Sequence, residues 1–265
     1  MKIAIITPSY NQGKFIKCTI ESVLNQNYNN FVHIIQDNLS SDCTRKVLES
    51  YSDSRLVYVL EKDHGQADAV NRGIQKVDAD IIGWLNSDDI YYNDTLQKIA
   101  TYFYENPEIG IVYGHANIID ENGNILGRYP VKKYNFQDLK NECFICQPSV
   151  FFRKSIFNDF GPLNVNLNYC MDYEFWLKLS MQNVSFGFIN KIISGTRHHS
   201  ETKTNKYKVE VHLEILAMMK SVLGYIPERW LANYAHVLMR KYFNFFYNNY
   251  FLRRLFTTVI ILLKR

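Results

Sequence analysis

Two absences narrow the class of protein. No G-x-G-x-x-G motif follows the first apolar run, which argues against the phosphate-binding loop of a dinucleotide-binding fold. No stretch reaches the roughly 18 to 20 apolar residues that a membrane-spanning helix needs. The N-terminal apolar run, residues 3–6, ends before Pro8 and is too short for the apolar region of a secretory signal peptide. We therefore expect a cytoplasmic protein without a spanning helix.

Cysteine is also scarce, and its pattern argues against disulfides. The five cysteines form an odd, scattered set, which is typical of reduced thiols in the cytosol. Cys143 and Cys146 have the spacing of metal ligands, but no second pair completes a zinc site. A chain of 265 residues can bury one sizeable core, or one core with a small appendage.

The basic residues concentrate at the C-terminus. Residues 205–265 carry ten Lys or Arg against three Asp or Glu, whereas the preceding 204 residues carry twenty against twenty-three. Aromatic residues interleave with this basic tail: Trp230, Tyr234, Tyr242, Phe243, Phe245, Phe246, Tyr247, Tyr250, Phe251 and Phe256. We divide the chain into a domain, 1–204, and a helical extension, 205–265. The extension is expected to contact a membrane surface; alternatively, its aromatics pack on the domain or on another subunit. No nucleic-acid-binding fold accompanies it.

Apolar periodicity predicts alternating strands and helices over the first hundred residues. The expected strands are 2–7, 31–36, 57–60 and 81–85, and the expected helices are 16–24, a segment capped by Ser40-Ser41-Asp42 and ending at Tyr51, 65–76, and a segment beginning at Asp94. This alternation indicates an α/β fold with a mostly parallel sheet flanked by helices. The pattern then changes to strands at 111–113, 148–152 and 184–193, a hairpin at Asn122-Gly123, and a helix beginning at Asp172, which predicts a mixed second half.

Polar side chains follow the predicted parallel strands where each strand ends. They are Thr7-Pro8-Ser9-Tyr10-Asn11, Asp37, Asp63-His64-Gly65-Gln66 and Asn86-Ser87-Asp88-Asp89. Ligands of open α/β sheets bind at this edge. Two adjacent carboxylates there suit Mg²⁺ or Mn²⁺, which complete their coordination with substrate phosphates. The alternative interpretation is a solvated turn that caps the next helix.

These segments resemble the inverting family 2 glycosyltransferases of the GT-A (Rossmann-like) type. The similarity covers roughly the first 204 residues and rests on 7–11, 26–28, 37–42, 65–73 and 84–89. It implies transfer of a sugar from a nucleotide diphosphate donor with Mn²⁺ or Mg²⁺ as cofactor. It implies that Asp89 ligates the metal and that the nucleotide contacts Pro8, Ser9, Tyr10, Asn11, Asp37, Gln66, Asn71 and Asp88. The chain departs from the family at Asn86, where the family often has Asp.

Two later segments carry further similarity to this family. The segment 171–176 implies that Asp172 is the base that activates the acceptor hydroxyl, and we expect the helix N-terminus to keep its pKa low. The alternatives are a simple N-cap for Asp172 and Glu174 as the base. The segment 197–204 resembles the family's Arg-x-His-x-x-Ser-Lys-Thr loop, which implies that His199 contacts the metal or the diphosphate. More weakly, Arg197 and Lys203 are candidates for the diphosphate and Gln147 for the acceptor side, the alternatives being a flexible basic loop and a strand lead-in.

The expected function is that of an inverting glycosyltransferase using a UDP-linked sugar donor. Its acceptor would be a glycan or a lipid-linked saccharide, met by an enzyme that is peripheral on the inner face of the plasma membrane. One alternative is a non-catalytic sugar-nucleotide or glycan-binding protein, against which the intact Asp88, Asp89 and Asp172 argue. The other is a sugar nucleotidyltransferase, which requires a glycine-rich basic loop that the first strand lacks.

Overall fold

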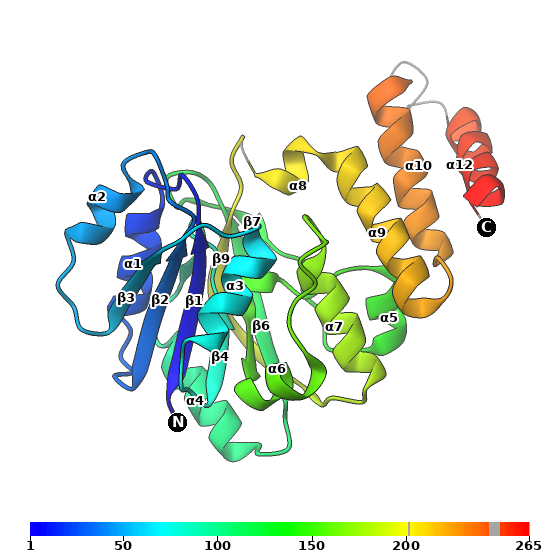
Figure 1. Cartoon of the computed structure of the whole chain (residues 1–265). Helices are drawn as coiled ribbons and strands as arrows, with labels where there is room; N and C mark the ends of the chain where they lie inside the picture. The colour runs from blue at the N-terminus through cyan, green and yellow to red at the C-terminus, as the bar shows by residue number, and fades with distance from the viewer. Residues whose placement is uncertain (201, 244–249, 265) are drawn as a thin grey trace. The chain divides into compact units, whose positions relative to one another are not determined.

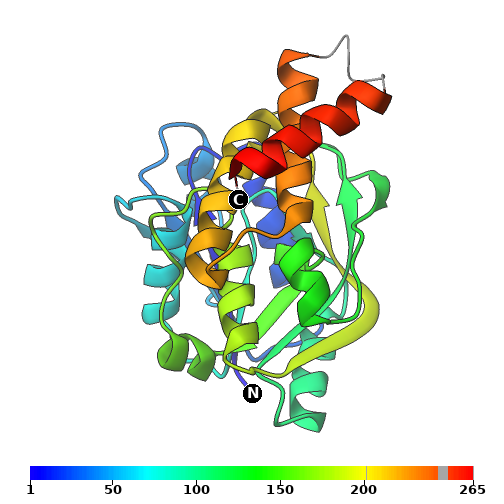
Figure 2. The same cartoon turned by 90° about the vertical axis from the view of Figure 1, so that its right-hand side faces the viewer.

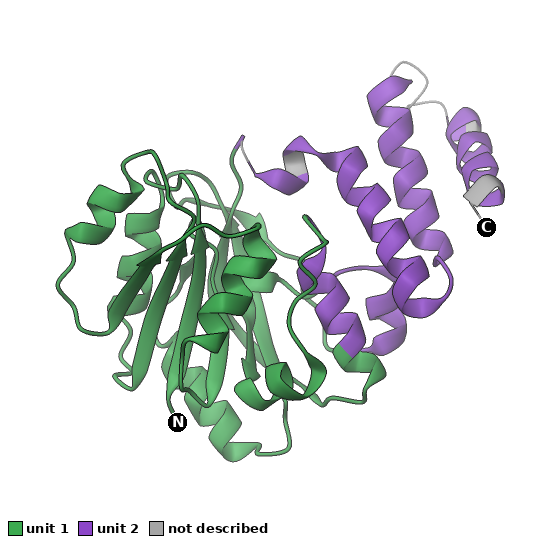
Figure 3. Ribbon diagram, viewed as in Figure 1, with its two compact units in different colours: residues 1–134, 144–168, 179–199 green, residues 135–143, 169–178, 200–265 purple. Residues whose placement is uncertain are grey.

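The computed structural model describes residues 1–200, 202–243 and 250–264 (Figure 1). Phe245, Phe246 and Tyr247 of the aromatic tail lie outside the described residues. The chain divides into two compact units (Figure 3). Unit 1 comprises residues 1–134, 144–168 and 179–199, and unit 2 comprises residues 135–143, 169–178 and 200–265.

Unit 1 is built on a nine-stranded mixed sheet with the order β3-β2-β1-β4-β8-β6-β9-β5, and β7 pairs with β6. The strands are β1 Ile3–Ser9, β2 Phe31–Asp37, β3 Leu56–Leu60, β4 Ile81–Trp84, β5 Ile90–Tyr91, β6 Ile111–Ile119, β7 Ile125–Arg128, β8 Val150–Arg153 and β9 Phe186–Arg197. The first four strands are parallel, as predicted. Strand β8 is antiparallel to both β4 and β6, which makes the second half mixed.

The central strand β1 sets the position of the ligand-binding edge. All its residues are buried because it lies between β2 and β4 and is covered on both faces. The chain runs outward from β1 to β3 and then returns to the other side of β1 as β4. The strand order therefore reverses between β1 and β4, and the crevice at the carboxyl ends of these two strands is where open α/β sheets bind ligands.

Helices cover both faces of this sheet. The helices of unit 1 are α1 Ile16–Leu24, α2 Thr44–Glu49, α3 Gln66–Gln75, α4 Thr95–Glu105 and α6 Lys154–Phe160, with the 3-10 helix η1 at Gln147–Ser149. Ile3 and Ile5 of β1 pack in one core with Val23 of α1 and with α4. Ile6 points to the opposite face, where a Cβ added at Gly73 of α3 would lie 2.4 Å from its Cγ2. A glycine at position 73 thus lets α3 approach the sheet closely.

Several boundaries differ from the prediction. The N-cap residue of α2 is Cys43, which makes no side-chain cap bond. The predicted capping segment still contributes, because the Asp42 carboxylate accepts hydrogen bonds from the backbone N–H of Thr44, the first residue of α2, and, at 2.9 Å, from that of Gly13. The strand predicted at 148–152 begins with η1, since Pro148 supports a helical turn before β8. The predicted hairpin at Asn122-Gly123 is confirmed and joins β6 to β7.

Unit 2 is helical in its described part. It contains α5 Phe136–Asn141, the part of α7 (Met171–Met181) up to Lys178, α8 Lys203–Lys206, α9 Lys208–Leu223, α10 Glu228–Tyr242 and α12 Tyr250–Lys264. Helix α12 packs against α10, and the ring centroids of Phe243 and Phe256 lie 5.7 Å apart (Figure 2). Among the described residues, no helix is long and apolar enough to cross a bilayer. The division of the chain between residues 204 and 205 stays a prediction.

A neutral buried histidine in β2 makes the stability of the fold depend on pH. His33 is fully buried beside β1, and its Nε2 lies 2.9 Å from the Thr7 hydroxyl. Its Nδ1 has no hydrogen-bond partner. Burial lowers the pKa of His33 to about 3, because the charged imidazolium would lose its hydration without gaining a counter-charge.

We predict that protonation of this histidine in the unfolded state destabilises the protein in acid. The folded pKa lies below the unfolded value, so the unfolded state binds more protons between those two pH values and stability falls as pH falls below about 6.5. The loss from this group between pH 7 and pH 4.5 is on the order of 2 to 3 kcal/mol. In denaturant unfolding, the free energy of unfolding should decrease less on acidification in His33→Gln than in wild type. The control His64→Gln, at an exposed position, should lose as much as wild type. Equal acid losses in wild type and His33→Gln would contradict the prediction.

Candidate active site

The ends of β1 and β2 are joined by the carboxylate of Asp37. The residue is buried, and Oδ2 accepts hydrogen bonds from the Ser9 hydroxyl at 3.0 Å and the Ser40 hydroxyl at 2.6 Å. Oδ1 accepts from the Ser40 backbone N–H at 2.8 Å. Asp37 therefore fixes the loop after β2 against β1. Tyr10 lies beside this anchor with 59% of its surface exposed, so its ring is accessible to a ligand.

Asn11 and Pro8 complete the loop after β1. The backbone of Asn11 is left-handed (φ 53°), a conformation that Asn tolerates well. Its N–H donates to the Ser40 hydroxyl at 2.8 Å, and its Oδ1 accepts from the Ser41 N–H at 2.9 Å. Pro8 is buried within the strand. The predicted nucleotide residues of β1 and β2 are thus brought together by direct contacts.

A second hydrogen-bond network is centred on the side chain of Asn86, directly after β4. Its Oδ1 accepts from the Trp84 indole at 2.9 Å and from Gln66 Nε2 at 2.7 Å. An indole N–H can only donate, which fixes the orientation of the Asn86 amide. Its Nδ2 therefore donates to Gln147 Oε1 at 2.9 Å and, over 3.4 Å, to Asp89 Oδ2. One side chain connects α3, β4 and η1.

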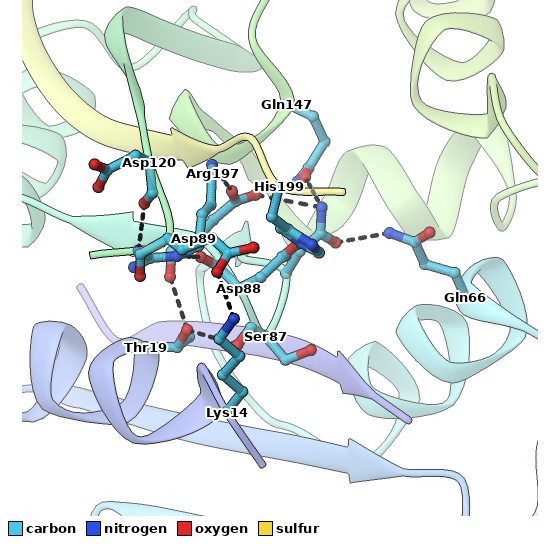
Figure 4. Close-up of polar contacts among 12 residues, drawn as sticks. Lys14, Thr19, Gln66, Ser87, Asp88, Asp89, Asp120, Gln147, Arg197 and His199 are labelled. Carbon is cyan, nitrogen blue, oxygen red and sulfur yellow. Dashed lines mark hydrogen bonds and ion pairs between the residues drawn. The ribbon is translucent and has the colours of Figure 1, made fainter. Parts of the chain in front are cut away.

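The two adjacent aspartates have different environments. Asp89 is buried, and its Oδ1 accepts the backbone N–H of Arg197 at 2.8 Å. Burial, followed by the neighbouring charge of Asp88, raises the pKa of Asp89 well above its usual value. The Thr19 hydroxyl donates to the backbone carbonyl groups of Ser87 at 2.9 Å and Asp89 at 2.8 Å (Figure 4). The loop between β4 and β5 is therefore held from α1 and from β9.

Asp88 points toward His199 rather than into the core. Its Oδ2 lies 3.0 Å from His199 Nε2, and 22% of its side chain is exposed (Figure 4). The His199 ring lies 4.8 Å, centroid to centroid, from that of Phe15. The structure pairs the predicted metal-contacting histidine with Asp88 and not with Asp89.

Arg197 is buried and braces the backbone. Its Nε donates to the Asp88 carbonyl at 2.7 Å, and its Nη1 donates to the carbonyl groups of Asp120 at 2.7 Å and Glu121 at 2.8 Å. These bonds connect the loop after β4 to the β6–β7 hairpin. These contacts give Arg197 a structural role, and its contact with a diphosphate stays a prediction.

Asn71 is also used for support. Its side chain donates to the Leu163 carbonyl and accepts from the Leu163 N–H, both at 2.9 Å. It is buried and holds the segment after α6 against α3. This double contact gives it a structural role, and its contact with a nucleotide stays a prediction. Gln147 is buried within the Asn86 network, where its Nε2 donates to the Trp84 carbonyl at 2.6 Å.

The predicted base belongs to unit 2. Asp172 lies in the first turn of α7, where its Oδ1 accepts the Tyr173 N–H at 2.8 Å. The expected low pKa is wrong: burial raises the pKa of Asp172 to about 6, because desolvation outweighs the lowering by the backbone hydrogen bonds. Glu174, the alternative base, pairs with Lys178 at 3.1 Å. Lys203 begins α8 in the same unit.

The donor chemistry suits a divalent cation at Asp88 and His199. A carboxylate oxygen and an imidazole nitrogen are ligands of Mn²⁺, and these two side chains face each other. Within the described ranges, no group of three His, Cys, Asp or Glu residues could hold a metal ion by itself. A cation here would complete its coordination with oxygens from elsewhere, as Mg²⁺ and Mn²⁺ do with substrate phosphates.

Sequence reasoning missed four supporting residues of this site: Thr19, Ser40, Trp84 and Asn86. Asn86 was placed in the polar strand end and noted as a departure from the family, but its part in a hydrogen-bond network was not predicted, although the long polar run after β4 was a signal that its amide would be paired. Thr19 and Ser40 gave no such signal, because a single hydroxyl in a helix or a serine-rich loop has many structural roles.

Comparison of the sequence with protein-family models identifies the family to which the chain belongs. A model described as "Glycosyl transferase family 2" matches residues 4–161, which is more than half of the chain. The chain belongs to this family, and its fold is that of the GT-A glycosyltransferases.

The relatives it resembles include characterised enzymes. The chain is 32% identical over 243 residues to the Escherichia coli UDP-Glc:alpha-D-GlcNAc-diphosphoundecaprenol beta-1,3-glucosyltransferase WfgD, covering 89% of this chain and 90% of WfgD. It is 30% identical over 222 residues to the glycosyltransferase RC0461 of Rickettsia conorii, where the match covers 77% of this chain and only 35% of that relative. It is similar in structure to Staphylococcus aureus TarS 1-349 in complex with UDP-GlcNAc (TM-score 0.67, 16% identity, 91% of this chain, 73% of that chain). It is also similar to the mannosyltransferase PcManGT of Pyrobaculum calidifontis, in complex with GDP-Man and Mn²⁺ (TM-score 0.64, 15% identity, 86% of this chain, 66% of that chain).

We predict that Asn86→Asp destabilises the protein in a pH-dependent manner. The new carboxylate would place an oxygen where an N–H now faces Gln147 Oε1 and Asp89 Oδ2, so its folded pKa would be raised. A raised carboxyl pKa removes stability above the unfolded pKa and restores it as pH falls. Unfolding at pH 8 should show a loss of about 1 to 3 kcal/mol that shrinks at pH 5. The exposed control Asn122→Asp should show no such loss. An Asn86→Asp protein as stable as wild type at pH 8 would show that the Asn86 hydrogen bonds do not stabilise the fold.

Proposed function

We propose that this protein is an inverting glycosyltransferase that moves a sugar from a UDP-sugar to a lipid-linked saccharide. The main support is the similarity to WfgD, which covers nearly the whole of both chains. WfgD is named for a UDP-glucose donor and a diphosphoundecaprenol-linked acceptor. The TarS complex with UDP-GlcNAc also supports a uridine donor.

The arrangement at the carboxyl ends of β1 and β4 supports donor binding there. We assign the nucleoside to the loop carrying Pro8, Ser9, Tyr10 and Asn11, which Asp37 anchors. Tyr10 contributes an exposed ring for contact with the base. Gln66 is held near this edge by Asn86.

We assign the divalent cation, Mn²⁺ or Mg²⁺, to Asp88 and His199, with Asp89 as the buried carboxylate that positions them. This division refines the prediction that Asp89 is the ligand, because both oxygens of Asp89 accept hydrogen bonds from within the protein. When bound, the cation would stabilise the negative charge of the departing diphosphate. The PcManGT complex with Mn²⁺ supports this choice of cofactor.

Asp172 is the proposed base. An inverting displacement requires a group that accepts the proton of the acceptor hydroxyl as that oxygen attacks the anomeric carbon. With a pKa raised to about 6, the Asp172 carboxylate is mostly ionised at pH 7.5 and is a stronger base than an ordinary aspartate. Protonation below pH 6 would remove its ability to accept a proton, so the rate should fall on the acid side.

The proposal is tested by separating donor binding from transfer. We expect calorimetry to detect UDP binding that requires Mn²⁺ and is weakened at least tenfold in Asp88→Asn and in His199→Gln. Asp172→Asn should bind UDP as wild type does but lose sugar transfer to a diphospholipid-linked acceptor by at least a thousandfold. Exposed Asp159→Asn is the matched control and should leave both activities unchanged.

Each other outcome points to a different conclusion. UDP binding without transfer by the folded wild-type protein, with no donor hydrolysis, would favour a non-catalytic binding protein. Pyrophosphate release from UTP and a sugar phosphate would favour a nucleotidyltransferase. Preference for GDP would retain the enzyme and change the donor. Transfer retained by Asp172→Asn would reject that residue as the base.

We further propose that α12 contacts the membrane surface and places the enzyme as a peripheral protein on the cytoplasmic face. Leu255, Val259 and Leu262 are spaced i, i+4 and i+7, and they are 53%, 43% and 67% exposed. Arg254 is exposed on the same helix. An apolar face with basic residues suits the interface of an anionic bilayer.

Replacing Leu255, Val259 and Leu262 by serine should release the protein from vesicles containing phosphatidylglycerol. These side chains are exposed, so the substitutions should leave the melting temperature unchanged while the sedimented fraction falls severalfold. The control replaces Ile125 and Leu126, which are 63% and 64% exposed on β7, by serine and should bind as wild type does. Undiminished sedimentation of the α12 variant would exclude this face, leaving packing against another subunit as the alternative.

A further inference from the structure

The first turn of α7 is built into the helices of unit 2. The Tyr173 hydroxyl donates to the Leu139 carbonyl at the end of α5. The Trp230 indole of α10 lies 3.2 Å from both the Lys140 carbonyl and the Tyr173 hydroxyl. The rings of Tyr173 and Trp230 are 5.6 Å apart. The residue next to Asp172 is therefore held by helices that precede and follow it in the chain.

A carboxylate from α9 holds the entrance to the same turn. Glu214 Oε1 accepts the backbone N–H of Tyr169 at 2.7 Å and that of Cys170 at 2.9 Å. These residues immediately precede α7, where N–H groups lack partners within the helix. The negative charge of Glu214 also lies near the positive end of the helix dipole, where an anion is favoured.

We propose that Glu214 is a positioning residue for Asp172: it fixes the backbone entering α7 and thereby orients the base. This inference rests on the proposed role of Asp172. It gives the C-terminal extension a second task besides contact with a membrane, because α9 lies within the segment 205–265. Glu214 touches neither donor nor acceptor in this proposal and acts only through α7.

Electrostatics supports the same assignment. After burial, the charge of Glu214 contributes to the raised pKa of Asp172. Other titratable groups near this turn include Cys170, whose pKa is also raised by burial and by Glu214, and the ion pair of Glu174 with Lys178. Burial also raises the pKa of Tyr173 and that of Tyr169, and the charges of Glu210, Tyr207 and Glu214 raise the pKa of Tyr169 further. The Cys170 thiol therefore stays neutral, and Glu214 is the anion that α9 contributes.

The test compares Glu214→Gln with Glu214→Ala. Glutamine retains an oxygen that can accept both N–H groups but removes the charge, whereas alanine removes both. We expect Glu214→Ala to lower kcat at pH 7.5 between about tenfold and a hundredfold, with the KM for donor within twofold. Glu214→Gln should retain most of kcat and shift the acid limb of the pH profile to lower pH. Glu210→Gln, on an exposed residue one turn earlier in α9, is the matched control and should match wild type.

The outcomes separate this inference from the proposed function. If Asp172→Asn is inactive while both Glu214 variants match wild type in kcat and pH profile, the positioning role is wrong and the base assignment stands. If Asp172→Asn retains transfer, the base assignment and this inference both fail. A Glu214→Ala protein that does not fold leaves Glu214→Gln as the test, and an unshifted pH profile there overturns the proposal.

Discussion

The buried carboxylate of Asp89 is the constraint on which the loop after β4 depends. Removing a carboxylate from water is costly unless hydrogen bonds replace its hydration. Here the backbone N–H of Arg197 supplies one bond to Oδ1, and the Asn86 amide approaches Oδ2. These partners come from the end of β9 and from the loop itself. The loop is thereby fixed to the far half of the sheet as well as to β4.

This anchoring gives two adjacent, chemically identical residues different properties. Asp89 is turned inward and both of its oxygens accept hydrogen bonds, whereas Asp88, in the preceding turn, is partly exposed and contacts His199. Two carboxylates this close repel each other, which contributes to the raised pKa of Asp89. A divalent cation at Asp88 would offset that repulsion. The geometry therefore favours a cation site over the alternative of a simple capping turn, because a capping turn does not require a second, buried carboxylate.

The fold could be predicted from the sequence because its signals are local. The apolar runs of β1, β2 and β4 and the 3.6-residue period of α1 specify each element without reference to the rest of the chain. The polar strand ends were also correctly placed at one edge of unit 1. The pKa of Asp172 was predicted in the wrong direction, and the hydrogen bonds of Arg197 and Asn71 were not predicted. Both depend on burial and on partners distant in sequence, for which spacing gives no information.

The same limit applies to the C-terminal extension. Its composition indicated a separable basic tail, because charge and aromatic content change near residue 205. Yet Glu214 of α9 and Trp230 of α10 make specific hydrogen bonds to the segment that carries Asp172. Helices α9 and α10, which precede α12 in the chain, therefore contribute to the environment of the proposed base. Loss of the whole extension would therefore disturb the backbone that enters α7 at Asp172, whereas changes confined to the exposed face of α12 leave the Glu214 contacts intact.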